Sequence, residues 1–374
     1  MHSDNGPHMS YEVGGQLWVK DAPGFAEAIT QAHAARQRPR CMCTTEGVEM
    51  YVARLAEPHG GYIVKRMPDT GCRHAPDCPS YEPSAELSGL EQFLGNAIVE
   101  DPSTGKTTLK LDFPLSKMPA RTQTPRGASH RDRLVSDGCK LSLRNLLHYL
   151  WEQADLTRWH PGFAGKRHWA TVRRHLLAAA APMVTRNDTL LHKLYLPEAF
   201  SVEKRDAIKA RRLAQWTPAL AQPGRVSQLM LLIGEVKEIV PSRYGFKIVI
   251  KHVPDQSFAV QERLYRQLEH HFANELELWG TDDTIRLAII ATFGVSQAGL
   301  PCIDTLSLMA LTSEWIPIAN GYEAHLVRAL IHDNRCFIKT QCYNGRKTAE
   351  VASAVLTDTD EAVVMAPNAQ QTLA

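Results

Sequence analysis

Residues 41–78 read CMCTTEGVEMYVARLAEPHGGYIVKRMPDTGCRHAPDC, and they contain four of the eight cysteines in the 374-residue chain. Two β-rich runs, 48–55 and 61–66, are joined through a turn that contains Pro and Gly, which predicts a β-hairpin. Because a hairpin brings its two ends together, we expect the Cys-x-Cys pair before it to meet the His-x3-Cys pair after it. Cys and His ligands gathered by tight turns are typical of a tetrahedral zinc site.

The segment offers five candidate ligands for four positions. Pro76 can hold a turn between His74 and Cys78, whereas Cys72 directly follows Gly71, so we treat Cys72 as the alternate ligand. We therefore expect the metal ligands to be Cys41, Cys43, His74 and Cys78. The competing interpretation is a group of buried or free thiols near a histidine.

The metal is expected to be structural Zn²⁺. A catalytic zinc ion keeps one position for water and needs a general base nearby, for which Glu82 or Asp69 would be the candidates. A closed site with four protein ligands needs no such base, and it is the interpretation that we favour.

Further motifs surround these ligands and extend along most of the chain. They are Gly47-Val-Glu-Met-Tyr51, Lys65-Arg-Met-Pro-Asp-Thr-Gly71, Ser80-Tyr-Glu-Pro83, Ile98-Val-Glu-Asp-Pro102, Leu147-His-Tyr-Leu-Trp151 with Trp159, and Gly234-Glu-Val-Lys-Glu238. Together with the Cys and His residues they resemble the bacterial family catalogued as domain of unknown function 1173. The resemblance implies a role in mobile-element biology, on plasmids or integrative conjugative elements, with protein partners from the same element. It leaves the choice between Cys72 and His74 open.

Composition indicates a globular protein of a reducing compartment. Hydrophobic residues make up 44% and charged residues 22% of the chain, which argues against a mostly disordered protein. Eight cysteines, half of them in one cluster, are too few for a disulfide scaffold, so we expect a cytoplasmic location. The longest apolar stretches, 229–233 and 287–295, are shorter than the roughly 18–20 residues that cross a bilayer, and no membrane contact is expected.

The pattern of elements predicts an α+β protein built from several parts. Those parts are a disordered segment or tag over 1–14, a zinc-stapled β-rich module over 15–116, a basic helical domain with a winged-helix-like arrangement over 117–224, a C-terminal mixed α/β sheet domain over 225–366, and a tail over 367–374.

Two more hairpins and one long helix are expected within these parts. The hairpins pair 96–100 with 107–113 and 228–240 with 246–253, and apolar residues at helical spacing predict one helix over 257–278. Residues 114–138 lack a periodic apolar pattern and are expected to form a linker or loop.

The middle of the chain carries a local excess of positive charge. Residues 117–175 contain 12 Lys and Arg against 4 Asp and Glu, a net +8, whereas the whole chain is +2. Because such side chains neutralise phosphates, this segment predicts a nucleic-acid surface, with DNA the first candidate, in which the second of two helices faces the nucleic acid. The residues expected to contact it are Arg144, Lys166, Arg167, Arg173 and Arg174. A solvated charged face is the competing interpretation.

A weaker enzyme alternative lies in the C-terminal part. Glu235 and Lys237 have the acid-x-Lys spacing of metal-dependent nucleases, and Asp358 would have to approach them from a neighbouring strand. Alternating charge on an exposed strand face explains Glu235 and Lys237 equally well. We therefore expect no catalytic residue and a nucleic-acid-binding protein with structural zinc, acting in plasmid or integrative-element maintenance or transfer. A metal-dependent nuclease or hydrolase and a protein-interaction scaffold are the alternatives.

Overall fold

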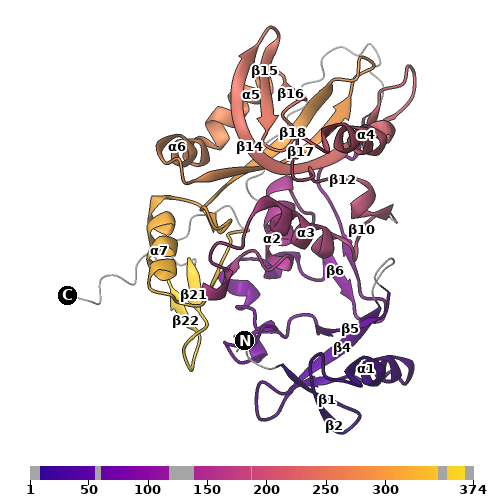
Figure 1. Cartoon of the computed structure of the whole chain (residues 1–374), viewed down its shortest axis with the longest axis vertical. Coiled ribbons are helices and arrows are strands. Elements are labelled where there is room, and N and C mark those ends of the chain that lie inside the picture. Colours follow the sequence, from indigo (N-terminus) through magenta and orange to yellow (C-terminus); the bar gives the residue numbers. More distant parts are fainter. Residues whose placement is uncertain (1–8, 55–59, 118–138, 187, 344–351, 367–374) are drawn as a thin grey trace, which may run out of the picture.

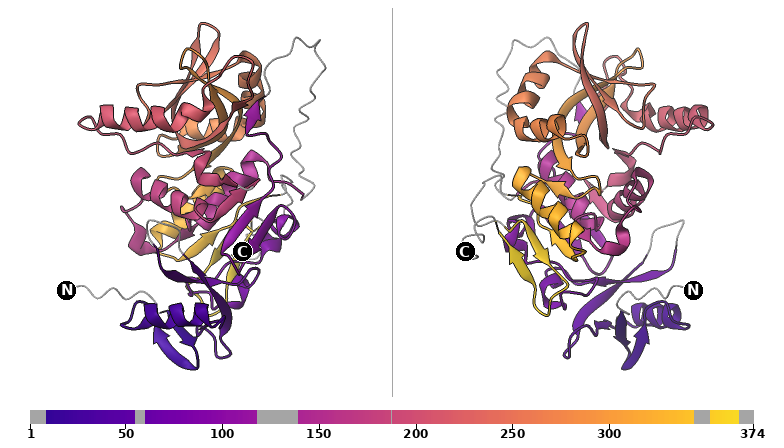
Figure 2. Two further views of the ribbon diagram at one scale, coloured as in Figure 1. Left: turned by 90° about the vertical axis from the view of Figure 1, so that its right-hand side faces the viewer. Right: turned by 60° about the vertical axis from the view of Figure 1, so that its left-hand side comes forward.

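The computed structural model describes residues 9–54, 60–117, 139–186, 188–343 and 352–366. These residues form seven α-helices and several sheets, so the prediction of a mixed α+β fold is confirmed. The molecule is elongated, with the N-terminal strands at the bottom of Figure 1, helices α2 (Leu143–Gln153) and α3 (Trp169–Ala180) in the middle, and the longest strands at the top. Figure 2 shows the same order from two other sides.

The N-terminal part is a five-stranded antiparallel sheet in the order β2-β1-β3-β4-β5. Its elements are β1 (Ser10–Val13), β2 (Gln16–Val19), α1 (Phe25–Ala34), β3 (Arg40–Cys41), β4 (Val48–Arg54) and β5 (Tyr62–Arg66). We call these elements, with the loop through residue 84, the N-terminal module. The expected hairpin of 48–55 with 61–66 is confirmed as β4–β5.

Ordered structure begins earlier in the chain than expected. Tyr11 in β1 is buried, and its ring stacks on Phe25 with the centroids 5.6 Å apart. The range 1–14 that we expected to be disordered or a tag was therefore wrong from residue 10 onward, because Tyr11 and Val13 alternate into the core. Residues 1–8 lie outside the described residues.

The middle of the molecule combines a small sheet with two packed helices. The sheet has the order β11-β10-β7-β6, with β6 (Ile98–Asp101), β7 (Lys106–Leu109), β10 (Met183–Thr185) and β11 (Asp188–Thr189). Helix α2 begins after Ser142, whose side chain accepts a hydrogen bond from the Asn145 N–H, and eight of its eleven residues are buried. Hairpin β10–β11 follows α3, but β10 also pairs with β7, and the winged-helix-like arrangement stays a prediction.

Five strands at the top of Figure 1 close into a barrel. They are β14 (Met230–Ser242), β15 (Gly245–Ile250), β16 (Phe258–Val260), β17 (Arg286–Val295) and β18 (Pro301–Leu311). β14 pairs with β15, β15 with β16, β16 with β18, β18 with β17, and β17 again with β14, and only the β16–β18 pair is parallel. The interior is filled by side chains such as Leu232, Ile248, Phe258 and Phe293. The expected hairpin over 228–253 is confirmed as β14–β15.

The helix that we expected over 257–278 is three elements. Phe258 and Val260 point into the barrel from strand β16, and only then do α5 (Glu262–His271) and α6 (Ala273–Thr281) follow, separated at Phe272. The expectation was wrong because the apolar residues of a short strand continued the spacing of the helix that follows it.

The remaining elements join distant parts of the chain. A four-stranded sheet pairs β9 (Arg158–Trp159) with β20 (Phe337–Lys339), followed by β21 (Ala354–Leu356) and β22 (Val363–Met365), near helix α7 (Gly321–His332). Strands β12 (Leu194–Tyr195) and β19 (Pro317–Ile318) extend the barrel sheet, β8 (Ser116–Lys117) pairs with β13 (Ser227–Gln228), and α4 is Arg205–Trp216.

Hydrophobic cores cross the expected domain boundaries. Phe93, Leu146 and Ile290, from three different expected domains, belong to one buried cluster. Ile338 and Val355 from the C-terminal sheet pack into the core of the N-terminal module. The three segments therefore do not have separate cores, because a sequence pattern indicates which face of an element is buried but not what covers it. Most of the expected linker and the whole tail lie outside the described residues.

Candidate metal centre

The first ligand pair comes from the end of β3 and the turn after it. Gly47 closes this turn with φ +66°, a backbone conformation that favours glycine. The Arg40 guanidinium donates to two carbonyl oxygens of the turn at 2.5 and 3.0 Å. These contacts fix the backbone so that Cys41 and Cys43 approach the same point.

The second ligand pair follows β5. The Cys78 N–H donates to the Ala75 carbonyl at 2.9 Å, closing a β-turn in which Pro76 occupies the position that favours proline. Just before it, a Cβ on Gly71 would lie 2.7 Å from the Glu82 Cβ, so glycine allows the loop to fold back on itself. This is the turn that we expected Pro76 to hold between His74 and Cys78.

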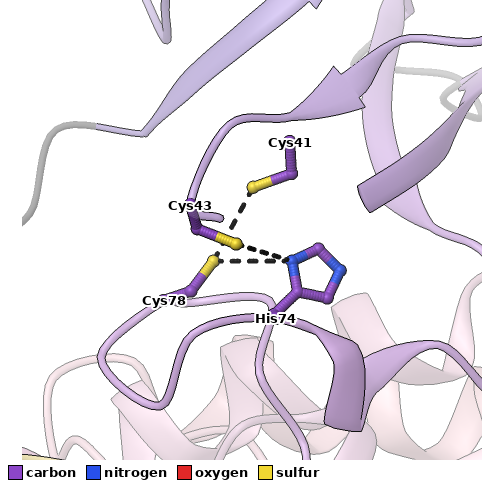
Figure 3. Close-up of side chains that lie close together, drawn as sticks. All are labelled: Cys41, Cys43, His74 and Cys78. Atoms are coloured by element: carbon purple, nitrogen blue, oxygen red, sulfur yellow. Dashed lines mark hydrogen bonds between the residues drawn. The ribbon is translucent and has the colours of Figure 1, made fainter. Parts of the chain in front are cut away.

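Three sulfur atoms and one ring nitrogen face a common centre (Figure 3). Cys41 Sγ lies 3.8 Å from Cys78 Sγ, and His74 Nδ1 lies 3.3 Å from Cys43 Sγ and 3.7 Å from Cys78 Sγ. All four ligand atoms lie within 4.8 Å of one another. A tetrahedron with Zn–S of about 2.3 Å and Zn–N of about 2.0 Å has edges of roughly 3.5–3.8 Å, and the three distances given above lie close to that range.

The centre is enclosed, and backbone amides donate hydrogen bonds to two of its sulfur atoms. Cys41 is 1%, His74 3% and Cys78 4% exposed, and Cys43 is half-buried. Backbone N–H groups donate to the ligand sulfurs, from Ala75 to Cys43 at 3.5 Å and from Ser80 to Cys78 at 3.4 Å. Such N–H···S bonds stabilise negative sulfur, which is the form that binds a metal.

Protonation of the thiols is uneven. A hydrogen bond from Cys41, together with His74 and the Ser80 amide, lowers the pKa of the Cys78 thiol to about 4. The same hydrogen bond, with burial, raises the pKa of Cys41. Binding of a divalent cation by these sulfurs would require the loss of the thiol protons. Coordination through Nδ1 places the ring proton of His74 on Nε2, which is buried and has no hydrogen-bond partner among the residues that the structure describes.

Cys72 does not belong to this cluster. It is exposed and lies in the short 3-10 turn Gly71–Arg73, so the structure brings together His74 and not Cys72 as the fourth ligand. Glu82, one candidate base for a catalytic zinc ion, forms an ion pair with Arg66 at 2.5 Å. The enclosed donor set therefore fits a structural metal.

The loop after Cys78 also forms one wall of a cavity of about 680 Å³ that sequence reasoning did not anticipate. Tyr149 donates to Glu100 at 3.1 Å and Tyr343 donates to Glu152 at 2.6 Å. Burial raises the pKa of Glu152 to about 8. No motif could have revealed this cavity, because its walls come from β6, α2 and β20 as well as from the loop after Cys78.

The residues expected to contact nucleic acid divide into two groups. Arg167 donates to the backbone carbonyls of Leu156 and Arg158, and Arg173 donates to the Leu196 carbonyl at 3.0 Å, so both arginines make contacts within the protein. Lys166 and Arg174 are exposed and Arg144 is half-buried. Other cations of the segment, Arg121, Arg126, Arg131 and Arg133, lie outside the described residues.

The three residues of the nuclease alternative are not assembled into one site. Glu235 is 5% exposed in β14 and accepts from Lys251 at 2.9 Å and from Arg286 at 2.8 Å. Asp358 follows β21 in a different sheet and pairs with Arg335 at 2.8 Å. The expectation that Glu235 lies on an exposed strand face was wrong, because β14 is covered on both sides where it changes partner from β17 to β15; only Lys237 is exposed.

None of the helices in the described part of the chain is long and apolar enough to cross a membrane. Comparison with curated proteins and with solved structures finds no significant match. A family model described as "Protein of unknown function (DUF1173)" matches residues 11–372, almost the whole chain, and includes all four clustered ligands. The protein therefore belongs to the DUF1173 family.

Proposed function

We propose that the protein binds nucleic acid and that a structural zinc ion holds its N-terminal module. The zinc part rests on three thiols and one imidazole whose ligand atoms lie within 4.8 Å of one another, a donor set typical of structural zinc. Four protein ligands leave no position for a reacting water. Cytoplasmic location is part of this proposal, since thiolate ligands persist in a reducing compartment.

Elemental analysis of protein purified without chelator tests the metal. We expect about one zinc ion per chain. Protein without any transition metal, yet with residues 40–84 protected from hydrogen exchange, would contradict the zinc assignment.

The proposal that the protein binds nucleic acid rests on the strand order of the barrel. Its first strand, β14, pairs with the second and fourth strands, its third and fifth strands are parallel, and helices α5 and α6 connect the third to the fourth. This is the order of the OB-fold, a five-stranded Greek-key barrel that binds oligonucleotides and oligosaccharides. A fold alone does not establish a function, so the argument also needs charge.

The charge of the barrel surface favours nucleic acid over an oligosaccharide as the ligand. Lys237, Arg243 and Lys247 in the β14–β15 hairpin have no acidic partner among the described residues. The ring of Trp169, at the start of α3, stacks on His252 just after β15, with centroids 5.5 Å apart. The positive middle segment therefore adjoins the barrel, and the exposed Lys166 and Arg174 extend its positive surface. We place this binding in the maintenance or transfer of a mobile element, as the family resemblance implies.

Binding to DNA at several salt concentrations tests the proposal. Phosphate contacts release counterions, so affinity should fall steeply as salt rises. Replacing Arg174 with Ala should flatten the slope by up to about one unit. If neither double-stranded nor single-stranded DNA binds at low salt, the nucleic-acid function is wrong and the interaction scaffold becomes the better explanation.

A further inference from the structure

Among the residues that the structure describes, the core shared with α2 covers only part of the outer surface of the barrel. The outer faces of β14, β17 and the second half of β18 pack into the core shared with α2, through Leu231, Ile233, Ala288, Ile290, Met309 and Leu311. The outer face of β15, β16 and the beginning of β18 has no such cover in that core. Strand register places Lys247, Ala259 and Cys302 side by side across it.

Exposure varies along this face, because Val249, on the same side of β15 as Lys247, is only 9% exposed. Ala259 and Cys302 are exposed and Lys247 is half-buried, while their neighbours Ile248, Phe258 and Ile303 point into the barrel. A small alanine in the centre allows a flat group to approach the backbone. Lys247 supplies a positive charge that no acidic side chain in the described part of the chain neutralises.

One edge of the face is marked by an aromatic side chain in an unusual position. Tyr244, at the tip of the β14–β15 hairpin, is 83% exposed, more than any other large hydrophobic or aromatic side chain recorded as exposed in the described residues. The Arg243 guanidinium lies 5.3 Å from the centre of its ring. An exposed ring beside a cation offers both a stacking platform for a base and a contact for its phosphate.

The opposite end of β15 leads to the positive start of α3. His252 follows this strand and stacks on Trp169, and Lys166 is exposed three residues before that tryptophan. Six residues of β15 span roughly 20 Å, so the hairpin tip and the start of α3 bound a track of that length. OB-type barrels accommodate about 4–16 nucleotides in such tracks.

We propose that the outer face of β15 and β16, bounded by Tyr244 and Arg243, is a binding site for single-stranded nucleic acid. This inference rests on the nucleic-acid function proposed above and names the form of nucleic acid that the barrel selects. Unpaired bases expose faces that can stack on Tyr244, whereas the bases of a duplex are already stacked on one another. Lys247 and Arg243 contact the backbone, which makes binding depend on salt more than on sequence.

The experiment compares two probes on the zinc-loaded full chain. Fluorescence anisotropy measures binding of an oligothymidylate of about 20 nucleotides and of a duplex of the same length. We expect the single strand to bind more tightly. Tyr244→Ala should weaken single-strand binding about tenfold, because each stacked base contributes about 1–3 kcal/mol, a factor of roughly 5 to 150.

Three further variants separate the effects of stacking, charge and unfolding. Tyr244→Phe keeps the ring, so it should retain the wild-type affinity for the single strand. Lys247→Ala should reduce the dependence of single-strand affinity on salt by about 0.7 in slope, while Lys20→Ala, an exposed lysine on the N-terminal module, should not. Since Tyr244 is exposed, none of its variants should change the unfolding midpoint.

The outcomes distinguish this inference from the general function. Equal loss of duplex and single-strand binding in Tyr244→Ala, or no loss in either, would overturn the single-strand site but leave nucleic-acid binding intact. Tighter binding of the duplex by the wild type would also overturn it. The absence of binding to both probes would remove the proposed function itself.

Discussion

The N-terminal module and the barrel are held together in different ways. In the module, two of the metal-centre cysteines, Cys41 and Cys78, are themselves members of the small buried cluster. In the barrel, large apolar side chains from all five strands fill a closed interior, with Trp216 and Phe293 at its aromatic centre. Under the zinc assignment proposed above, the metal centre adds to the apolar burial of a module whose buried cluster is smaller than that of the barrel.

The largest expected effect follows from breaking the metal centre. Cys78→Ser should abolish metal binding and unfold residues 40–84, because structural zinc contributes on the order of 10 kcal/mol to the folding of a site of this kind. The barrel should keep its structure. Elemental analysis and hydrogen exchange measure both effects, and Cys302→Ser, an exposed barrel cysteine, is the control. Undiminished protection of residues 40–84 would show that the module does not depend on the metal.

The matching change in the barrel is Phe293→Ala. Phe293 is fully buried, and its ring lies 5.2 Å from Trp216 and 5.3 Å from Phe258. Truncation leaves a cavity and should lower the free energy of unfolding by about 3–5 kcal/mol. Denaturant unfolding measures this change, and zinc content under native conditions should stay at the wild-type level. Loss of zinc in this variant would mean that the two regions unfold together.

Local patterns predicted much of both regions. The hairpins β4–β5 and β14–β15 and the ligand pair around Pro76 depend on residues close in sequence, so turn chemistry and β-rich runs were enough to identify them. Pro76 favoured His74 over Cys72 in the sequence, with Cys72 as the alternate ligand. The turn that positions His74 separates them, and it depends on Gly71 packing against a residue of the same loop.

Pairings between distant residues could not be predicted. Nothing in the sequence indicates that β16 pairs with β18, or that β17 returns to β14, yet these pairs close the barrel. The same limit explains why the sequence could not show that two arginines make contacts within the protein. Arg167 and Arg173 looked like surface cations, but they donate to backbone carbonyls that only the tertiary fold brings near them.

A smaller effect is expected from Glu235→Ala, at the point where β14 changes partner. Removing this buried carboxylate leaves Lys251 and Arg286 without their acceptor, but both cations are 29–48% exposed and can be solvated. The free energy of unfolding should fall by about 1–3 kcal/mol. Chemical denaturation measures the loss, and Glu235→Gln should lose less because its amide oxygen can still accept a hydrogen bond.

The same variant tests the enzyme alternative. We expect neither the wild type nor Glu235→Ala to cleave linear or supercoiled DNA in magnesium or manganese, since Glu235 is already bound by two cations. Metal-dependent nicking by the wild type that disappears in the variant and in EDTA would instead make Glu235 part of a nuclease site.

The smallest expected effect is that of Cys72→Ser. This variant tests whether Cys72 is a metal ligand or only lies close to the ligands in the sequence. Cys72 lies two residues before His74 and is exposed, whereas the cluster already offers the four ligand atoms that structural zinc needs. We expect Cys72→Ser to keep about one zinc ion per chain and to leave the unfolding midpoint within the usual range of a surface substitution, about 0.5 kcal/mol. Elemental analysis and denaturant unfolding, run beside Cys78→Ser, measure both quantities. If Cys72→Ser loses the metal while His74→Ala retains it, then the fourth ligand is Cys72, and the loop over residues 71–78 must rearrange when the metal binds.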